Sequence, residues 1–188
     1  GPREIVLKMR AASINYRDIL MIGGLYNPKQ KLPLIPLSDG VGEVIAIGSE
    51  VKRFAVGDRV MRAFFQGWIS GPVPRDTESL KCALGGPLDG VLRTRMCIEA
   101  EHGVKVPAHL TDAEAATLPC AGLTAWGAIV EQSQLMPGDT VVLLGTGGVS
   151  IFALQFAKMI ACRTIITSSS DEKLARAKSL GADATINY

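Results

Sequence analysis

The chain has 188 residues, 47% of them hydrophobic, and its 20 Lys and Arg residues nearly balance its 18 Asp and Glu residues. This balance gives no indication of a nucleic-acid partner or of attraction to a membrane surface. No apolar run approaches the roughly 20 residues that span a bilayer, and no secretory signal opens the chain. We therefore expect a cytoplasmic protein with one large or two modest domains.

The four cysteines follow neither a disulfide pattern nor a zinc-knuckle pattern. Cys82, Cys97, Cys120 and Cys162 are scattered and lack C-x-x-C spacing. We expect buried, reduced thiols.

Short strands separated by glycine turns are predicted in the first part of the chain. Strand patterns cover residues 4–13 and 41–47, and a turn at residues 57–58 leads into another strand. Short strands joined by glycine turns favour a β-barrel-like domain. Residues 66–90 are rich in Gly and Pro and predict a long loop, which is usually functional or mobile. Thr111 and Glu114 can form a capping box for the helix that leads into a second domain.

The run Val-Val-Leu-Leu-Gly-Thr-Gly-Gly-Val-Ser at residues 141–150 reads as a buried strand, a glycine-rich turn and the start of a helix. Gly145 would allow the tight turn, and Gly147 would let backbone N–H groups approach phosphate oxygens. The sixth position of the G-x-G-x-x-G pattern is Ser150, so a purely steric turn is the alternative.

The residues that follow predict a strand–helix–strand unit with parallel strands. A helix is expected over residues 151–160, a strand over 163–167, and a second helix with a capping box from Ser169 to Glu172. Gly181 is the expected end of that helix, and residues 184–187 read as a third strand. Only the first mononucleotide half of a dinucleotide-binding fold is present, so we expect a fragment of a longer protein.

The sequence resembles the medium-chain dehydrogenase/reductase superfamily, and most of all its zinc-independent quinone-oxidoreductase-like branch, truncated at both ends. The resemblance implies an α/β plus β fold, with a GroES-like β-barrel catalytic domain over residues 1–111 and a partial Rossmann coenzyme domain over residues 112–188. Besides the glycine turn, the segments that show the resemblance are residues 10–18 (RAASINYRD), 38–44 (SDGVGEV), 56–60 (VGDRV), 115–126 (AATLPCAGLTAW) and 180–183 (LGAD).

Zinc is the first question that this resemblance raises. Asn15 and Ser38 stand at the first two ligand positions of the zinc-dependent members, and only Cys120 falls at the third. A single thiolate cannot supply the three protein ligands that catalytic zinc needs. A structural zinc is not expected either, because the long loop offers only Cys82. We expect no metal, and for His102 and His109 we expect solvent-exposed or capping roles.

The resemblance also implies roles for polar residues near the start of the chain. It places Asn15 beside the nicotinamide and Tyr16 within reach of the substrate oxygen, whereas packing at a domain seam is the alternative for Tyr16. Asp18 would support the site, or it would only cap a helix. Thr124 is implied to lie near the nicotinamide end of the cofactor.

The expected cofactor is NADPH. NAD-specific folds place an acid at the end of the second strand, where this chain has Ser168 and Ser169. The resemblance implies that Lys173 and Tyr188 contact the 2′-phosphate, and the orientation of Asp171 and Glu172 decides whether they cancel the charge of Lys173. The expected cofactor contacts of the glycine turn are Gly145, Thr146, Gly147, Gly148 and Val149.

The expected function is zinc-independent hydride transfer from NADPH to a quinone, enone or other carbonyl compound, with only small-molecule partners. The full-length form is expected to be a homodimer. Two alternatives remain open: an inactive truncated module that binds a nucleotide or a partner chain, and an alcohol dehydrogenase.

Overall fold

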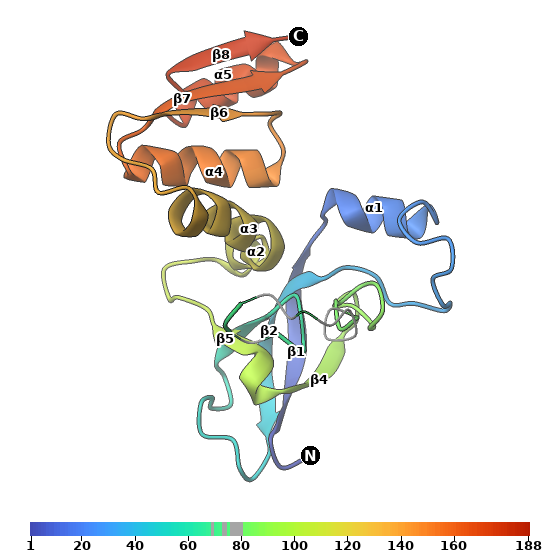
Figure 1. The fold of residues 1–188 in the computed structure, drawn as a ribbon. Coiled ribbons are helices and arrows are strands. Elements are labelled where there is room, and N and C mark those ends of the chain that lie inside the picture. Colours follow the sequence, from blue (N-terminus) through green and yellow to red (C-terminus); the bar gives the residue numbers. More distant parts are fainter. Residues whose placement is uncertain (69, 73–74, 76–80) are drawn as a thin grey trace. The chain divides into compact units, whose positions relative to one another are not determined.

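The computed structural model describes residues 1–68, 70–72, 75 and 81–188, and the chain divides into two compact units, Gly1–Cys120 and Ala121–Tyr188. The elements of both units are labelled in Figure 1. The predicted domain boundary after residue 111 falls at the start of a helix of the first unit, and as a family-domain assignment it stays a prediction. No helix of the described residues is long and apolar enough to cross a membrane.

An antiparallel sheet of five strands, in the order β4-β1-β2-β3-β5, forms the first unit. Ile5 and Leu7 of the first strand are buried while the residues next to them are more exposed, as period-two alternation predicts. The turn before the third strand places Gly57 at a φ of +93°, which favours glycine. The strands are β1 (Glu4–Ser13), β2 (Asp39–Ile47), β3 (Arg59–Arg62), β4 (Arg95–Glu99) and β5 (Gly103–Lys105).

Three short helical segments complete this unit: α1 (Tyr16–Ile22), a 3-10 turn at Ala100–His102, and α2 (Asp112–Ala116). The capping box predicted at the start of α2 is confirmed. Glu114 N donates to Thr111 Oγ1 at 3.2 Å, and Thr111 N donates to Glu114 Oε2 at 2.8 Å.

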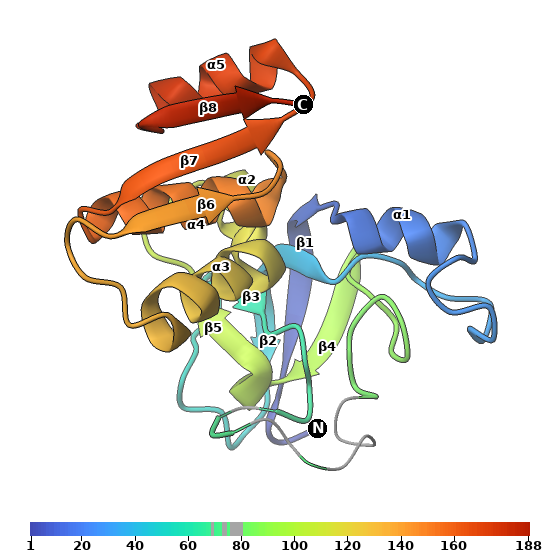
Figure 2. The ribbon, with the colours of Figure 1, turned by 45° about the horizontal axis from the view of Figure 1, so that its top comes forward.

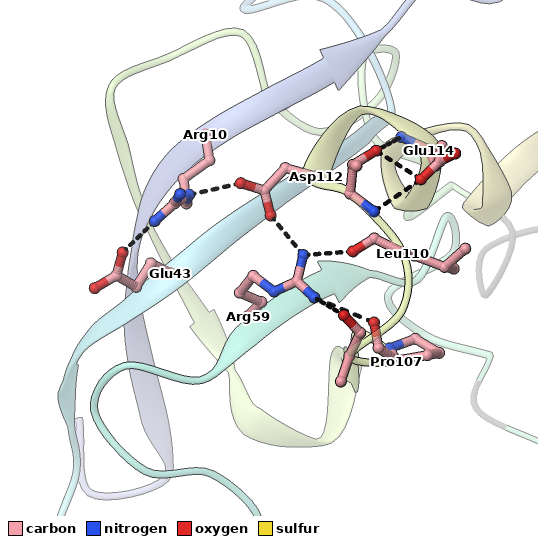
Figure 3. Close-up of polar contacts among 9 residues, drawn as sticks. Arg10, Glu43, Arg59, Pro107, Leu110, Asp112 and Glu114 are labelled. Atoms are coloured by element: carbon pink, nitrogen blue, oxygen red, sulfur yellow. Dashed lines mark hydrogen bonds and ion pairs between the residues drawn. The ribbon is translucent and has the colours of Figure 1, made fainter.

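A network of charged side chains ties α2 to the sheet, as Figure 3 shows. Asp112 accepts hydrogen bonds from Arg10 Nε at 2.7 Å and from Arg59 Nη1 at 3.1 Å. Arg10 also pairs with Glu43 at 2.7 Å, and Arg59 donates to the carbonyl of Leu110 at 2.7 Å. Residues of β1, β2 and β3 therefore fix the start of α2.

The second unit contains a three-stranded parallel sheet in the order β6-β7-β8. Figure 2 shows the three strands running in one direction. Helices connect the strands as expected, with Leu154 and Ile166 fully buried between them. The elements are a π-helical turn at Leu118–Gly122 that crosses the boundary between the units, α3 (Leu123–Trp126), a second π-helical turn at Gly127–Gln132, β6 (Thr140–Leu143), α4 (Gly148–Met159), β7 (Arg163–Ser168), α5 (Asp171–Ser179) and β8 (Ala184–Asn187).

The capping box predicted from Ser169 to Glu172 is wrong. The N-cap of α5 is Ser170, whose hydroxyl accepts from Lys173 N at 3.4 Å. The strand β7 runs one residue further than expected, to Ser168, and this extension moves the start of the helix. The predicted end of α5 is confirmed, since Gly181 adopts a φ of +102° directly after the cap residue.

Two further expectations need correction or restriction. The cysteines form no disulfide within the described residues. The expectation that they are buried is wrong for three of them, because only Cys162 is buried and Cys97 is exposed on β4. Of the predicted loop at residues 66–90, residues 69, 73–74 and 76–80 lie outside the described part. The remainder is anchored, because Gln66 N donates to the carbonyl of Cys82 at 3.1 Å.

Candidate functional site

A group of polar residues, which we call the polar cluster, gathers in the first unit around the start of β2. Asp39 is its centre. This carboxylate is fully buried and accepts hydrogen bonds from Ser38 Oγ at 2.6 Å and from Cys120 N at 2.9 Å. Burial raises the pKa of Asp39, and the hydrogen bond from Ser38 opposes that shift. The members are Asn15, Asp18, Ser38, Asp39 and Cys120.

Asn15 and Asp18 belong to the start of α1, which directly follows β1. Asn15 is the N-cap, and its backbone N–H donates to Asp18 Oδ2 at 2.8 Å. The capping role considered for Asp18 is thus present, yet this side chain is only 1% exposed. Asn15 Nδ2 and Asp18 Oδ1 are buried and make no hydrogen bond with any described residue. Such unpaired buried groups are uncommon, and a water molecule or a ligand could supply their partners.

The thiol of Cys120 lies in an environment that disfavours its charged form. Burial raises its pKa to about 11, and the nearby carboxylates of Asp39 and Asp18 add to this shift, which Arg17 opposes. Cys120 is therefore a neutral thiol at neutral pH.

Tyr16 lies outside this cluster. Its side chain is 75% exposed at the first position of α1, next to Asn15. Its predicted contact with a substrate oxygen stays a prediction.

The glycine turn of the second unit has the geometry of a phosphate-binding loop. Gly145 adopts a φ of +77°, which side-chain-bearing residues rarely adopt, and its N–H donates to Thr167 Oγ1 at 3.0 Å. The α4 helix then begins at Gly148, so its unpaired N–H groups face outward from the turn. Ser150 stands where the pattern has glycine, and its hydroxyl donates to the carbonyl of Leu144 at 2.9 Å. It therefore closes the turn by hydrogen bonding.

Gly147 is the glycine that the protein itself does not require. Its φ of −76° is ordinary, and a Cβ placed there would meet no atom within 4 Å. The space beside it is open, which suits a phosphate group approaching the backbone closely. Gly148 differs, because a Cβ there would lie 3.4 Å from the Cβ of Ala121, in van der Waals contact with the preceding helical segment.

Polar side chains meet at the end of β7, beside the glycine turn. Ser168 is buried, and its Oγ lies 3.1 Å from Thr146 Oγ1 and accepts from Ser170 N at 3.3 Å. Its hydroxyl therefore holds the loop together, whereas Ser169 is exposed. No carboxylate occupies this strand end.

Neither Asp171 nor Glu172, the acidic residues at the start of α5, forms an ion pair with Lys173 in the described structure. Asp171 Oδ1 accepts from Asn187 Nδ2 of β8 at 2.6 Å. Lys173 is exposed and forms no ion pair within the part of the chain that the structure describes. Thr124 and Tyr188, the other predicted cofactor contacts, are also exposed.

Comparisons with known proteins settle the family. Residues 1–108 match the family model described as "Alcohol dehydrogenase GroES-like domain", and residues 148–188 match the model described as "Zinc-binding dehydrogenase". The chain belongs to the medium-chain dehydrogenase/reductase superfamily. The predicted fold, a GroES-like domain followed by part of a Rossmann-type parallel sheet, is confirmed.

Relatives share this architecture over the whole chain. The zinc-type alcohol dehydrogenase-like protein C1773.06c of Schizosaccharomyces pombe is 45% identical, over 100% of this chain and 54% of its own length. A crystal structure from Sinorhizobium meliloti 1021, described as an alcohol dehydrogenase, is 46% identical with a TM-score of 0.91, over 100% of this chain and 55% of that one. The Escherichia coli quinone oxidoreductase complexed with NADPH is 26% identical with a TM-score of 0.76, over 100% and 51%. The chain thus spans about half the length of the relatives it matches.

The polar cluster does not fit a catalytic zinc ion, although one matched family model is named for zinc. Zinc binds thiolate, imidazole and carboxylate groups. At the positions expected for ligands stand an amide (Asn15), a hydroxyl bonded to Asp39 (Ser38) and a single thiol (Cys120). Within the described residues, no group of three or more His, Cys, Asp or Glu side chains could hold a metal.

Sequence reasoning missed two residues of this region, Asp39 and Arg17. Both lie in segments that carried the family resemblance. An acidic residue directly before a buried, glycine-containing strand was a usable signal for Asp39. The surroundings of Arg17 depend on residues up to 69 positions away, which no local pattern reveals.

Proposed function

We propose that the protein is part of an NADPH-dependent oxidoreductase that transfers hydride to a quinone, an enone or another carbonyl compound without zinc. The observation that carries this proposal is the open backbone at Gly147, between the positive-φ turn at Gly145 and the start of α4. Glycine at this position is not needed by the chain's own packing, whereas a bound pyrophosphate needs the space.

The second unit supports the adenosine side of the cofactor. The N–H groups at the start of α4 would bind the pyrophosphate, and Ser169 and Lys173 would lie by the ribose. Since Asp171 is hydrogen-bonded to Asn187, its carboxylate is held by β8 while Lys173 has no ion pair in the described chain. A free cation and the absence of an acid at the end of β7 favour the 2′-phosphate of NADPH over the free hydroxyl of NADH.

The first unit supports binding of a carbonyl substrate. Asn15 offers an unpaired amide N–H group, which can donate a hydrogen bond to a substrate oxygen or to the nicotinamide amide. NADPH supplies the hydride when bound, and the chain's residues orient the acceptor and stabilise charge on its oxygen. The relatives include proteins named as quinone oxidoreductases and alcohol dehydrogenases, which fits a carbonyl or alcohol substrate.

The experiment combines metal analysis with coenzyme binding. The zinc content of the purified chain is measured before and after dialysis against a chelator, and NADPH is titrated into both samples while nicotinamide fluorescence is recorded. We expect saturable NADPH binding without zinc. Failure to bind NADPH, or stoichiometric zinc that is needed for binding a carbonyl substrate, would contradict the proposal. Oxidation of NADPH by a quinone then separates an active protein from one that only binds the coenzyme.

A further inference from the structure

The guanidinium group of Arg17 lies over two aromatic rings of the first unit. Its central carbon is 5.3 Å from the ring centroid of Tyr26 and 5.0 Å from that of Phe64. Its Nη1 donates to the carbonyl of Leu84 at 3.0 Å. Ring contacts and this hydrogen bond hold the group in one orientation, so little side-chain entropy remains to be lost when it binds a ligand.

Gly86 leaves the space that the tip of Arg17 occupies. A Cβ at this glycine would lie 2.4 Å from Arg17 Nη2, so the guanidinium group would have to move. The φ of Gly86 does not fall in the range that favours glycine. Glycine at this position therefore leaves the guanidinium group in the place where it contacts the two rings.

Arg17 has no carboxylate partner within ion-pair distance among the described residues, unlike Arg53. Arg53 also lies over an aromatic ring, at 5.4 Å from Phe54, but its charge is paired with Glu101 at 3.0 Å. Most N–H donors of Arg17 thus have no protein acceptor. The charge of Arg17 acts on the polar cluster, since it lowers the pKa of both Asp18 and Cys120.

We propose that Arg17 is a specificity-determining residue that binds a carboxylate group of the substrate, so that the preferred substrates are conjugated carbonyl compounds bearing a carboxylate. A planar guanidinium group held against aromatic rings presents its N–H donors at its edge, where a carboxylate can accept two of them. The rings of Tyr26 and Phe64 also offer apolar surface to the conjugated part of such a molecule. The inferred reaction of such substrates rests on the proposed function. The inferred binding of a carboxylate to Arg17 does not.

A pair of probes that differ in one charge tests it on the chain itself. Cinnamate and its uncharged methyl ester are titrated without coenzyme while the arginine side-chain signals are followed by nitrogen-15 NMR. We expect cinnamate to shift the Arg17 signal and to bind at least about tenfold more tightly than the ester. Equal affinity for the two probes would overturn the proposal.

Variants separate this role from a structural one. Arg17→Gln should abolish the preference for cinnamate, and Arg17→Lys should keep part of it, because the charge remains while the planar group is lost. Gly86→Ala should also reduce the preference, since it displaces the guanidinium group without removing charge. Arg53→Gln is the matched control and should leave both affinities unchanged. If Arg17→Gln still binds cinnamate more tightly than the ester, the proposal for Arg17 is contradicted. If that variant also binds NADPH, the proposed function is not affected by this failure.

Discussion

The backbone N–H of Cys120 donates a 2.9 Å hydrogen bond to Oδ2 of Asp39, a fully buried carboxylate that lies 81 residues earlier in the chain. The same carboxylate accepts from Ser38 Oγ through its other oxygen. Asp39 therefore connects the start of β2 to the last residue of the first unit. Two of the three positions at which the family resemblance implies zinc ligands, Ser38 and Cys120, are instead hydrogen-bonded to this single side chain.

Replacing Asp39 should destabilise the first unit. Asp39→Ala leaves the Cys120 N–H and the Ser38 hydroxyl without their acceptor, and each unsatisfied buried donor costs about 1–3 kcal/mol. We expect the free energy of unfolding, measured with urea, to fall by about 2–4 kcal/mol. Asp39→Asn should lose less, because its amide oxygen still accepts one bond. Equal stability of Asp39→Ala and the wild type would show that these bonds contribute little.

The reactivity of Cys120 should reflect its raised pKa. With a pKa of about 11, this thiol is almost entirely protonated at mildly alkaline pH, so alkylation by iodoacetamide should be slow. Mass spectrometry of digested protein gives the rate for each cysteine across a pH series. Asp39→Asn removes a nearby negative charge and should speed the reaction of Cys120. A rate for Cys120 that matches an unperturbed cysteine contradicts this description of the cluster.

Asp183 should make the second unit sensitive to acid. Its Oδ2 accepts from Lys158 Nζ at 2.9 Å and from Thr164 N at 2.7 Å, and these contacts hold its pKa well below the usual range. A carboxylate whose pKa is lower in the folded state stabilises the fold above its unfolded pKa of about 3.9, and this contribution is lost as the pH falls further. Asp183→Asn should reduce the free energy of unfolding at neutral pH. In this variant that free energy should also fall less as the pH is lowered. Urea unfolding at a series of pH values measures both, and an unchanged slope in Asp183→Asn would exclude this role.

The two glycines of the turn should respond differently to substitution. Gly147→Ala meets no atom within 4 Å and should change the free energy of unfolding by less than about 0.5 kcal/mol, yet raise the dissociation constant of NADPH at least about tenfold. Gly145→Ala, at a φ of +77°, should lower stability by about 1–2 kcal/mol as well. Gly127→Ala is a control, because its Cβ also meets nothing and it belongs to the separate π-helical turn Gly127–Gln132. Unchanged NADPH affinity in Gly147→Ala would falsify the phosphate site.

Much of the fold followed from local patterns. The strand at residues 4–13, the capping box at Thr111 and the third strand at residues 184–187 were predicted with the observed bounds, because alternation and capping chemistry are written in neighbouring residues. The cap of α5 was placed one residue early, since three consecutive serines offer equally good caps and the length of β7 decides among them.

The polar cluster was less predictable because long-range contacts define it. Asn15 and Asp18 stood out only through family motifs, and the bond between Asp39 and Cys120 joins segments that no local spacing relates. The environment of Arg17 likewise depends on three residues that come together only in the folded chain, Tyr26, Phe64 and Gly86. Contacts between residues far apart in the chain produce no periodic pattern in the sequence.

Coenzyme preference tests the central claim most directly. The dissociation constants of NADPH and NADH are measured for the wild type and for Lys173→Ala, with Glu172→Gln as the control on the same helix turn. We predict that the wild type binds NADPH at least about tenfold more tightly than NADH, the size of a contact worth roughly 1.4 kcal/mol, and that Lys173→Ala loses most of this preference. Equal affinities in the wild type, or a ratio that Lys173→Ala leaves unchanged, would contradict the account.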